Sequence, residues 1–174
     1  MSEIKEIAQL GAAVLRLNSQ PITDVNSVET RDLIAAMKTT LAGTQGVGLA
    51  APQIGSSQRI MIVASRPCPR YPNAPLMKPI VMINPSFQPL SDAKEKEWEG
   101  CLSIPGIRAL VPRFKHIRID YTDEQSALIE TCLHDFIARV FQHEFDHLNG
   151  LVFLDRVESS RDIFSESEYL KLCR

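Results

Sequence analysis

Apolar residues recur at helical spacing between residues 27 and 42. The apolar stripe consists of Leu33, Ile34, Met37 and Leu41. These positions share one face of a helix, because residues three and four apart lie above one another. Asn26 and Glu29 have the spacing of a capping box at the start of this segment, and Gly43 suits its end. The pattern predicts a helix over 27–42.

A second amphipathic pattern covers residues 134 to 148. Its stripe follows the spacing i, i+4, i+7 and i+11 and consists of Phe136, Val140, His143 and His147. Asn149 and Gly150 then supply residues that tolerate the left-handed conformation at a helix end. The pattern predicts a helix that turns both histidines toward the interior.

Short runs rich in β-forming residues lie between and around the two helical segments. We predict strands at 59–64, 79–84, 96–103, 116–121 and 127–133. The segments 43–55 and 66–79 are predicted to be loops, because they hold too many Gly and Pro residues for regular elements. Residues 151–157 are a candidate for a further strand, and Ser165 with Glu168 could cap a short C-terminal helix.

This order of elements has no strand–helix–strand rhythm and therefore indicates an α+β fold. We expect mostly antiparallel sheets packed around a central helix, the one predicted over 134–148. The 174 residues fit a single domain, 1–174, that is long enough to bury a sizeable core.

The composition excludes several classes of protein. A formal net charge of −2 gives no electrostatic basis for binding nucleic acid or an anionic membrane. No stretch approaches the roughly 20 apolar residues of a membrane span, and the first residues lack the plan of a signal peptide. The cysteines at 68, 101, 132 and 173 are widely scattered, so we expect no disulfide framework. These features are typical of a cytoplasmic protein.

The predicted second helix carries the pattern His-Glu-x-x-His at residues 143–147. Residues i and i+4 share a helix face, so His143 and His147 can bind one metal ion. Glu144 lies about 100° further round the helix, where it can meet a metal-bound water without being a ligand. Burying two imidazoles and a carboxylate without partners would be costly, and the pattern therefore favours a metal site over two core histidines.

A catalytic metal typically takes three protein ligands, so the pattern is incomplete by itself. Candidates for the third ligand are Cys101, His116, His134, Glu99 and a glutamate further along the chain. His134 would face the opposite side of the helix, and His116 heads an alternating strand and can simply be exposed. The third histidine of longer protease motifs is absent, because position 153 is Phe. Cys101 remains. From the residues alone, a role as metal ligand and a role as a small buried apolar residue explain Cys101 equally well.

Three segments together resemble those of peptide deformylases: GVGLAAPQ (46–53), EGCLS (99–103) and QHEFDH (142–147). Their order and spacing also match, and the resemblance extends from about residue 10 to 157. It implies that Cys101, His143 and His147 bind the metal and that Glu144 is the general acid–base acting on metal-bound water. It also implies that Gln53, otherwise a polar turn residue, and a backbone N–H near Leu102 hold the oxyanion.

The resemblance further implies an enzyme that removes the formyl group from nascent polypeptides beginning with N-formylmethionine. The expected substrate-binding residues are Val47, Gly48, Arg108, Arg139 and Val140. Gly48 suits a loop whose backbone pairs with an extended peptide, and Val47 and Val140 line the methionine slot. Arg108 is expected near the downstream peptide backbone, with an exposed strand charge as the alternative. Arg139 is expected to line the slot's rim with its aliphatic stem and keep its charge in water.

The implied cofactor is one divalent ion per chain, with Fe²⁺ first and Zn²⁺ or another divalent metal as alternatives, since imidazole and thiolate suit both. We expect a monomer, with nascent chains as its substrate and the ribosome as an open further partner. Three other interpretations remain: a small metalloprotease, a thiol hydrolase with Cys101 as nucleophile, and a metal-stabilised binding module without turnover.

Overall fold

The structure is a computed structural model that describes residues 4–67 and 71–172. Its first α-helix, α1, covers Val28–Ala42 as predicted. The predicted capping box at Asn26 is wrong by one residue, because the cap is Ser27, whose side chain accepts a hydrogen bond from Thr30 N at 3.1 Å. Ser27 competes with Asn26 for this place, and its hydroxyl lies at the spacing that the N3 amide requires.

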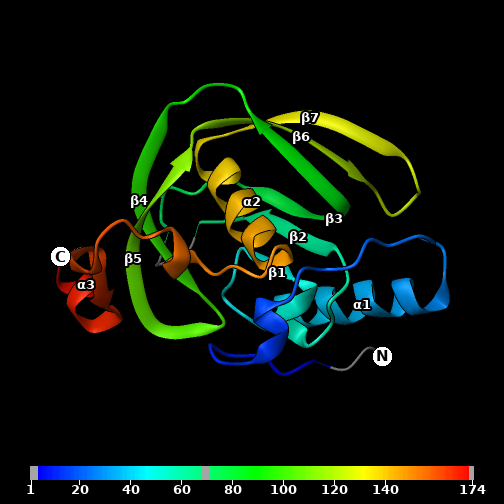
Figure 1. Ribbon diagram of the computed structural model, residues 1–174, viewed down its shortest axis with the longest axis horizontal. Helices are drawn as coiled ribbons and strands as arrows, with labels where there is room; N and C mark the ends of the chain where they lie inside the picture. Colours follow the sequence, from blue (N-terminus) through cyan, green and yellow to red (C-terminus); the bar gives the residue numbers. More distant parts are fainter. Residues whose placement is uncertain (1–3, 68–70, 173–174) are drawn as a thin grey trace.

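Five antiparallel strands form the larger sheet, in the spatial order β1-β2-β3-β6-β7 (Figure 1). The strands are β1 (Gly48–Ala50), β2 (Ile60–Ser65), β3 (Met77–Pro89), β6 (His116–Thr122) and β7 (Leu128–His134). Four of them confirm predicted strands, and β1 lies in a segment predicted to be a loop. Because β1 is the end strand of this order, one of its edges does not pair within the sheet.

The smaller sheet has the order β4-β5-β8 and comprises β4 (Lys94–Cys101), β5 (Ile104–Phe114) and β8 (Ile163–Ser165). The predicted strand 96–103 is too long at its end, because Leu102 and Ser103 form the turn that returns the chain into β5. Neither β5 nor β8 was predicted. Prolines and a glycine interrupt the alternation of β5, and β8 is three residues long.

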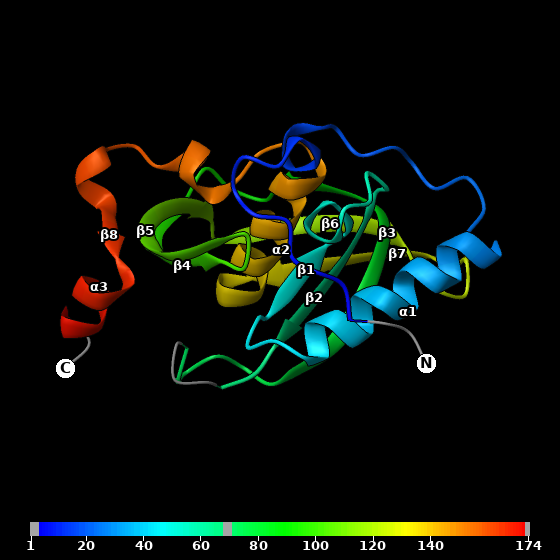
Figure 2. The same cartoon turned by 90° about the horizontal axis from the view of Figure 1, so that it is seen from below.

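The helix α2 (Asp135–Leu148) lies between the two sheets and packs on β1, β2, β5, β6 and β7, while α1 covers the other face of the larger sheet (Figures 1 and 2). The alternation of β2 explains this arrangement. Ile60 and Ile62 face α1, and Met61 and Val63 face α2. The α+β class with antiparallel sheets is therefore confirmed.

The chain after α2 does not form the expected strand at 151–157. It contains a 3₁₀-helix, η3 (Phe153–Arg156), because the Asp155 side chain accepts a hydrogen bond from Val152 N at 2.8 Å and turns the backbone. Three further 3₁₀-helices are η1 (Ala13–Arg16), η2 (Ala51–Ile54) and η4 (Ser160–Asp162). The short α3 (Glu166–Leu172) follows, and Ser165 Oγ accepts from Glu168 N at 3.3 Å, as predicted.

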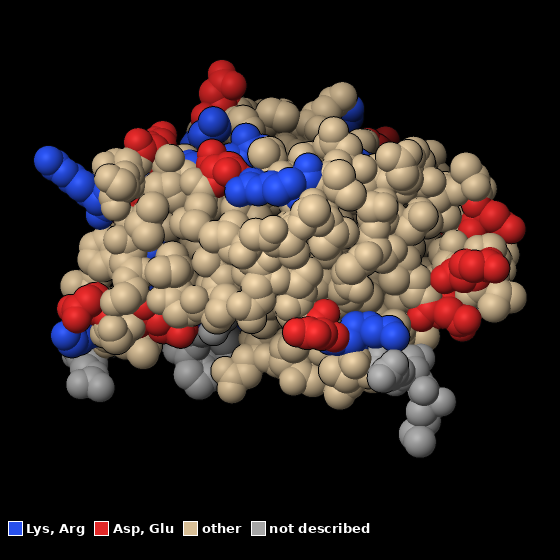
Figure 3. All heavy atoms as spheres, turned by 60° about the horizontal axis from the view of Figure 1, so that its bottom comes forward, with Lys and Arg blue, Asp and Glu red and all other residues tan. Residues whose placement is uncertain are grey.

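The surface bears few charged side chains across the middle of the face shown in Figure 3, and acidic residues gather at its right end. This face therefore has no continuous basic patch among the residues coloured there. Within the described ranges, none of the helices has the length and apolar character needed to cross a membrane. Cys101 and Cys132 are free thiols, while Cys68 and Cys173 lie outside the described residues.

Candidate active site

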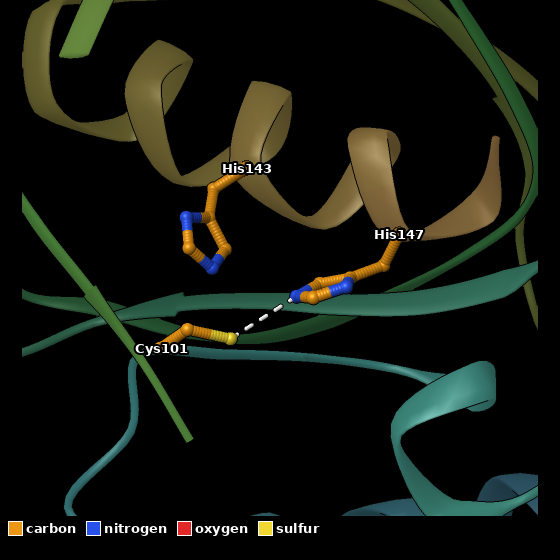
Figure 4. A group of neighbouring side chains, drawn as sticks. All are labelled: Cys101, His143 and His147. Carbon is orange, nitrogen blue, oxygen red and sulfur yellow. Dashed lines mark hydrogen bonds between the residues drawn. The ribbon is translucent and has the colours of Figure 1, made fainter. Parts of the chain in front are cut away.

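Cys101, His143 and His147 come together where α2 meets the end of β4 (Figure 4). Their ligand atoms all lie within 4.8 Å of one another, and all three residues are buried. Both imidazoles project from the same side of α2 toward the thiol, and His147 Nε2 lies 3.2 Å from Cys101 Sγ. Among the described residues, this is the group of His, Cys, Asp and Glu side chains able to hold a metal ion.

The donor set fits a metal. Two imidazoles and one thiolate are three protein ligands for a divalent ion such as zinc or ferrous iron, which leaves a position open for water or substrate. The thiol is prepared for this role: although burial opposes ionisation, the charge of His147 and hydrogen bonds from both histidines lower the pKa of Cys101 well below its ordinary value. His116 and His134, the other histidine candidates, lie elsewhere and pair with each other.

Glu99, another candidate ligand, instead supports His143 from behind. His143 Nδ1 lies 2.8 Å from Glu99 Oε2, so the ring donates there and turns Nε2 toward the thiol. Arg113 donates twice to the same carboxylate, at 2.8 and 3.0 Å. Burial by itself would raise the pKa of Glu99, but these partners hold it well below its ordinary value.

Asp146 is not part of the Cys101, His143 and His147 group and anchors α2 instead. Its carboxylate accepts from Arg113 Nη1 at 2.6 Å and from Arg156 Nη2 at 2.7 Å. Arg113 therefore links Glu99 to Asp146 and fixes β4, β5 and α2 around the Cys101, His143 and His147 group. Arg113 was not predicted as a residue of the site. Arg113 lies on β5 opposite Glu95 of β4, and this position can be assigned only once the β4–β5 register is known.

Glu144 lies in the same pocket wall as His143 and Cys101 and is buried. Among the described residues, its Oε2 atom has no hydrogen-bond partner. Burial raises the pKa of Glu144 to about 7, against the opposing charges of His143 and His147. A Cβ atom at Gly48 would lie 2.3 Å from Glu144 Oε1, so only glycine makes room for the carboxylate there.

Gln53 is fixed with its amide nitrogen toward the same centre. Its Oε1 accepts from Ala50 N at 2.8 Å, which turns Nε2 toward Cys101 Sγ at 3.5 Å and Ser103 Oγ at 3.3 Å. The side chain is almost fully buried. Leu102 occupies the adjacent turn between β4 and β5, so Gln53 and Leu102 flank the thiol.

A pocket opens beside these groups. Its walls combine the glycine-rich segment before β1, the end of β4 and one face of α2, and they include Val47, Gly48, Leu102, Arg139, Val140, His143 and Glu144. Tyr71 and Phe136, which the sequence analysis did not single out for this role, also line it, with ring centroids 5.0 Å apart. The pocket therefore combines apolar walls with the polar groups described above.

Comparison with known proteins identifies the family. The sequence model of the polypeptide deformylase family matches residues 4–162. The chain belongs to the polypeptide deformylase family. It is 48% identical over 170 residues to peptide deformylase 2 of Nostoc sp., covering 98% of this chain and 95% of that protein. Peptide deformylase 1 of Nitrosomonas europaea is 40% identical over 158 residues, 91% of this chain and 90% of its own.

Solved structures of deformylases match as well. The Met-Ala-Ser-bound crystal structure of class I type b peptide deformylase from Acinetobacter baumannii has a TM-score of 0.87 and 42% identity, covering 90% of this chain and all of that one. The peptide deformylase of Thermotoga maritima has a TM-score of 0.79 and 35% identity, with coverage of 90% and 99%. The resemblance seen in the sequence is confirmed: this deformylase is a hydrolase of a metal-dependent family that removes N-terminal formyl groups.

Arg139 of this deformylase corrects one expectation. Its guanidinium does not reach water but is buried, where it donates to Glu99 Oε1 at 3.0 Å, Val111 O at 2.7 Å and Glu95 O at 2.6 Å. Burial lowers the pKa of Arg139, and the Glu99 charge opposes that shift. The charge of Glu99 offsets the cost of burying the Arg139 guanidinium, and Arg139 lines the pocket in this paired state.

Arg108 is also buried, with 4% of its surface exposed, so the alternative of an exposed strand charge is wrong. It forms an ion pair with Glu166 of α3, and its guanidinium lies over the Tyr169 ring at 5.8 Å. Gly100 allows this packing, because a Cβ atom there would overlap the guanidinium. Arg108 borders a small cavity together with Leu102 and Ile104.

Proposed function

We propose that this chain removes the formyl group from N-formylmethionyl nascent polypeptides and releases formate, with Glu144 as general acid–base. The family supports deformylation of nascent chains. The observation that carries the mechanism is the buried Glu144 carboxylate, whose Oε2 atom is unpartnered among the described residues and lies beside the Cys101, His143 and His147 group. A general base needs a free oxygen at the reacting centre.

Cys101, His143 and His147 are the proposed metal ligands, for one ion per chain. We propose Fe²⁺ as the native ion, with Zn²⁺ or another divalent metal as alternatives, because thiolate and imidazole bind both. When bound, the ion lowers the pKa of a water molecule and polarises the formyl carbonyl. Glu99 holds His143 in the tautomer that leaves Nε2 free for the ion.

The chain's own residues carry out the proton transfer and bind the oxyanion. Glu144 Oε2 takes the proton of the attacking water and later delivers it to the nitrogen of the leaving amine. Gln53 Nε2 donates to the oxyanion that forms when the formyl carbon is attacked, together with the backbone N–H near Leu102. Because Ala50 N fixes the Gln53 amide before substrate arrives, the donor needs no reorganisation.

The substrate is proposed to lie along β1 with its methionine side chain in the pocket. The unpaired edge of β1 can add an extended peptide as a further strand, at Gly48. Val47 and Val140 supply apolar walls, Arg139 closes the end, and Arg108 borders the cavity proposed for the downstream backbone. The related Acinetobacter baumannii enzyme is described with Met-Ala-Ser bound, a peptide with the N-terminus that deformylation produces.

We propose that the described residues form one catalytic domain, with α2 as its central helix, and that the enzyme acts as a monomer in the cytoplasm, where nascent chains emerge from the ribosome. Contact with the ribosome itself is part of this proposal. Sedimentation of the purified protein with and without ribosomes tests both the monomeric state and that contact.

The deciding experiment is anaerobic purification with metal analysis, followed by measurement of formate release from a formyl-Met tripeptide. We expect one ion per chain and formate without cleavage of internal peptide bonds. Cleaved internal bonds would indicate a protease, and activity that survives chelation with covalent trapping of Cys101 would indicate a thiol hydrolase. Cys101→Ser serves as the matched variant and should lower metal content and formate release together, since a hydroxyl replaces thiolate poorly.

A further inference from the structure

The exposed face of the β6–β7 hairpin carries a second pair of facing histidines. His116 begins β6 and His134 ends β7, and the two residues are direct cross-strand partners. Their neighbours Lys115 and Asp135 share a backbone hydrogen bond of 2.8 Å, while the His116 carbonyl accepts from Leu90 on the other side. His116 and His134 are therefore a non-hydrogen-bonded pair, in which Cα atoms lie about 4.5 Å apart and side chains are closest.

The two rings turn the same nitrogen toward each other. The Nδ1 atoms are 2.9 Å apart, and the ring planes meet at 62°. At this distance one Nδ1 donates the proton that the other accepts. When both rings are neutral and carry their proton on Nε2 instead, each Nδ1 has a free lone pair. Both nitrogens can then bind one cation that lies to the side of the line joining them.

The separation indicates which ions fit. With metal–nitrogen bonds of about 2.0–2.1 Å, two nitrogens at a right angle lie about 2.9 Å apart, and two at a tetrahedral angle about 3.4 Å apart. The observed 2.9 Å equals the right-angle value and is shorter than the tetrahedral one, and it is also the length of an ordinary hydrogen bond. Square-planar or octahedral coordination by imidazole is typical of Ni²⁺ and Cu²⁺.

The surroundings do not oppose a cation. Arg118, the next residue on the same face of β6, donates to Gln88 at 2.9 Å and lies 4.0 Å from Glu130. The ammonium group of Lys115 lies 3.5 Å from Glu95 and 3.9 Å from Asp135. Each neighbouring positive charge is therefore engaged by a carboxylate or an amide oxygen.

We propose that His116 and His134 form a chelating site for one divalent transition-metal ion of the Ni²⁺ and Cu²⁺ class, separate from the catalytic group. His134 directly precedes α2, and His116 begins β6. An ion held by both residues ties the start of α2 to the sheet, and it stabilises the folded protein because the unfolded chain does not present the pair. The chain then binds a second ion beyond the one in the active site.

The test uses the whole protein with its catalytic site filled. Protein loaded with Ni²⁺ is dialysed to constant metal content, and further Ni²⁺ is added in equilibrium dialysis. We expect the parent to take up a second ion per chain and its melting temperature to rise with added Ni²⁺. His116→Asn and His134→Asn should bind one ion only and show no such rise, because the amide can still hydrogen-bond to the remaining imidazole but is a poor ligand.

The exposed Glu130→Gln is the matched control, since it changes a carboxylate on the same face and leaves both histidines; it should keep the second ion. Formate release should be the same in all of these proteins. Equal Ni²⁺ uptake by the parent and both histidine variants would overturn the proposal, and so would uptake of a single ion by the parent. If a histidine variant does not fold, which formate release would reveal, the corresponding Gln variant replaces it.

Discussion

The chain has four histidines, and they form two facing pairs that differ in nearly every other respect. His143 and His147 lie one turn apart on a helix and are buried, with ring centroids 5.3 Å apart. His116 and His134 lie across two strands at the surface, with ring centroids 5.0 Å apart. The distance between two imidazoles therefore does not by itself distinguish a catalytic pair.

The difference lies in what surrounds each pair. The buried pair has a thiol as third donor, a carboxylate behind one ring and a second carboxylate with an unpartnered oxygen beside it. Such groups cost free energy to bury, and two arginines, Arg113 and Arg139, compensate the charge of Glu99. A pair of histidines can bind an ion without these groups, whereas the proposed hydrolysis uses them.

The largest effect is expected from Glu144→Gln, which would leave the buried pair able only to bind metal. Gln keeps the shape of the side chain but cannot take a proton from water. Turnover should fall by about 10²–10⁴-fold, the typical contribution of a general acid–base. Metal content and melting temperature should stay close to those of the parent, because Glu144 is outside the ligand group.

Formate release, metal analysis and thermal unfolding of the same preparation check this prediction. The exposed Glu130→Gln should match the parent in all three measurements. Loss of metal in Glu144→Gln would make Glu144 a ligand or an essential support, and retained turnover would assign the proton transfer to another residue.

Gln53→Leu removes the fixed amide N–H donor beside the buried histidines. In the described structure, the surface pair His116 and His134 has no comparable donor. Turnover should fall by about 10²–10³-fold, as for loss of one oxyanion donor, with metal retained. The change also leaves Ala50 N without its partner, so thermal unfolding must accompany the kinetics. Gln53→Glu is the informative comparison, since it keeps an acceptor for Ala50 N and lacks the donor. Full activity in either folded variant would remove Gln53 from the catalytic set.

Much of this difference between the pairs could be predicted from the sequence. Both long helices have sustained periodic patterns, and the His-Glu-x-x-His spacing places two candidate ligands and one carboxylate within five residues. These features are local, and local spacing survives folding unchanged. The association of Cys101 with the histidines came from the family resemblance, because 42 residues separate it from His143 and no local pattern joins them.

The features that the sequence did not reveal depend on partners far apart in the chain. Arg139 was expected in water, because an arginine is rarely buried unless paired; its partner Glu99 lies 40 residues earlier. The strand β5 was missed because Pro105, Gly106 and Pro112 interrupt its pattern, yet it pairs with β4 along most of its length. The facing of His116 and His134 likewise follows from strand register.

Val140→Trp tests the pocket that accompanies the buried pair. Val140 lines the pocket and is buried, so a larger side chain should obstruct the methionine slot. The kcat/KM for formyl-Met substrates should fall further than that for formyl-Ala substrates, with about a 10–200-fold difference between the two losses. One methylene group that no longer fits an apolar pocket costs about 1–3 kcal/mol. The ratio of the two substrates is unaffected by any loss of folded protein. Equal losses would place the slot elsewhere.

The smallest effect on the chemical step is expected from Glu99→Gln. This variant also tests the comparison of the buried and surface histidine pairs most directly. Without its carboxylate, His143 becomes more like the surface histidines, which no carboxylate supports in the described structure. Metal affinity should fall by about 10–100-fold, the typical cost of losing such a support. Metal competition with a chelator measures this. Folding is also affected, because Arg113 and Arg139 lose their shared anion, at about 3–5 kcal/mol.

The pH dependence of unfolding separates the two consequences. The pKa of Glu99 is lowered by folding, so its charge stabilises the parent above 4.5, the ordinary pKa of a glutamate, and this stability is lost as the pH falls below that value. The variant has no such carboxylate, and its free energy of unfolding should decline less steeply in acid. Glu99→Asp keeps the charge and should retain the parent's acid limb while shortening the reach to His143. An unchanged metal affinity in folded Glu99→Gln would show that Cys101 and the two imidazoles hold the ion without help.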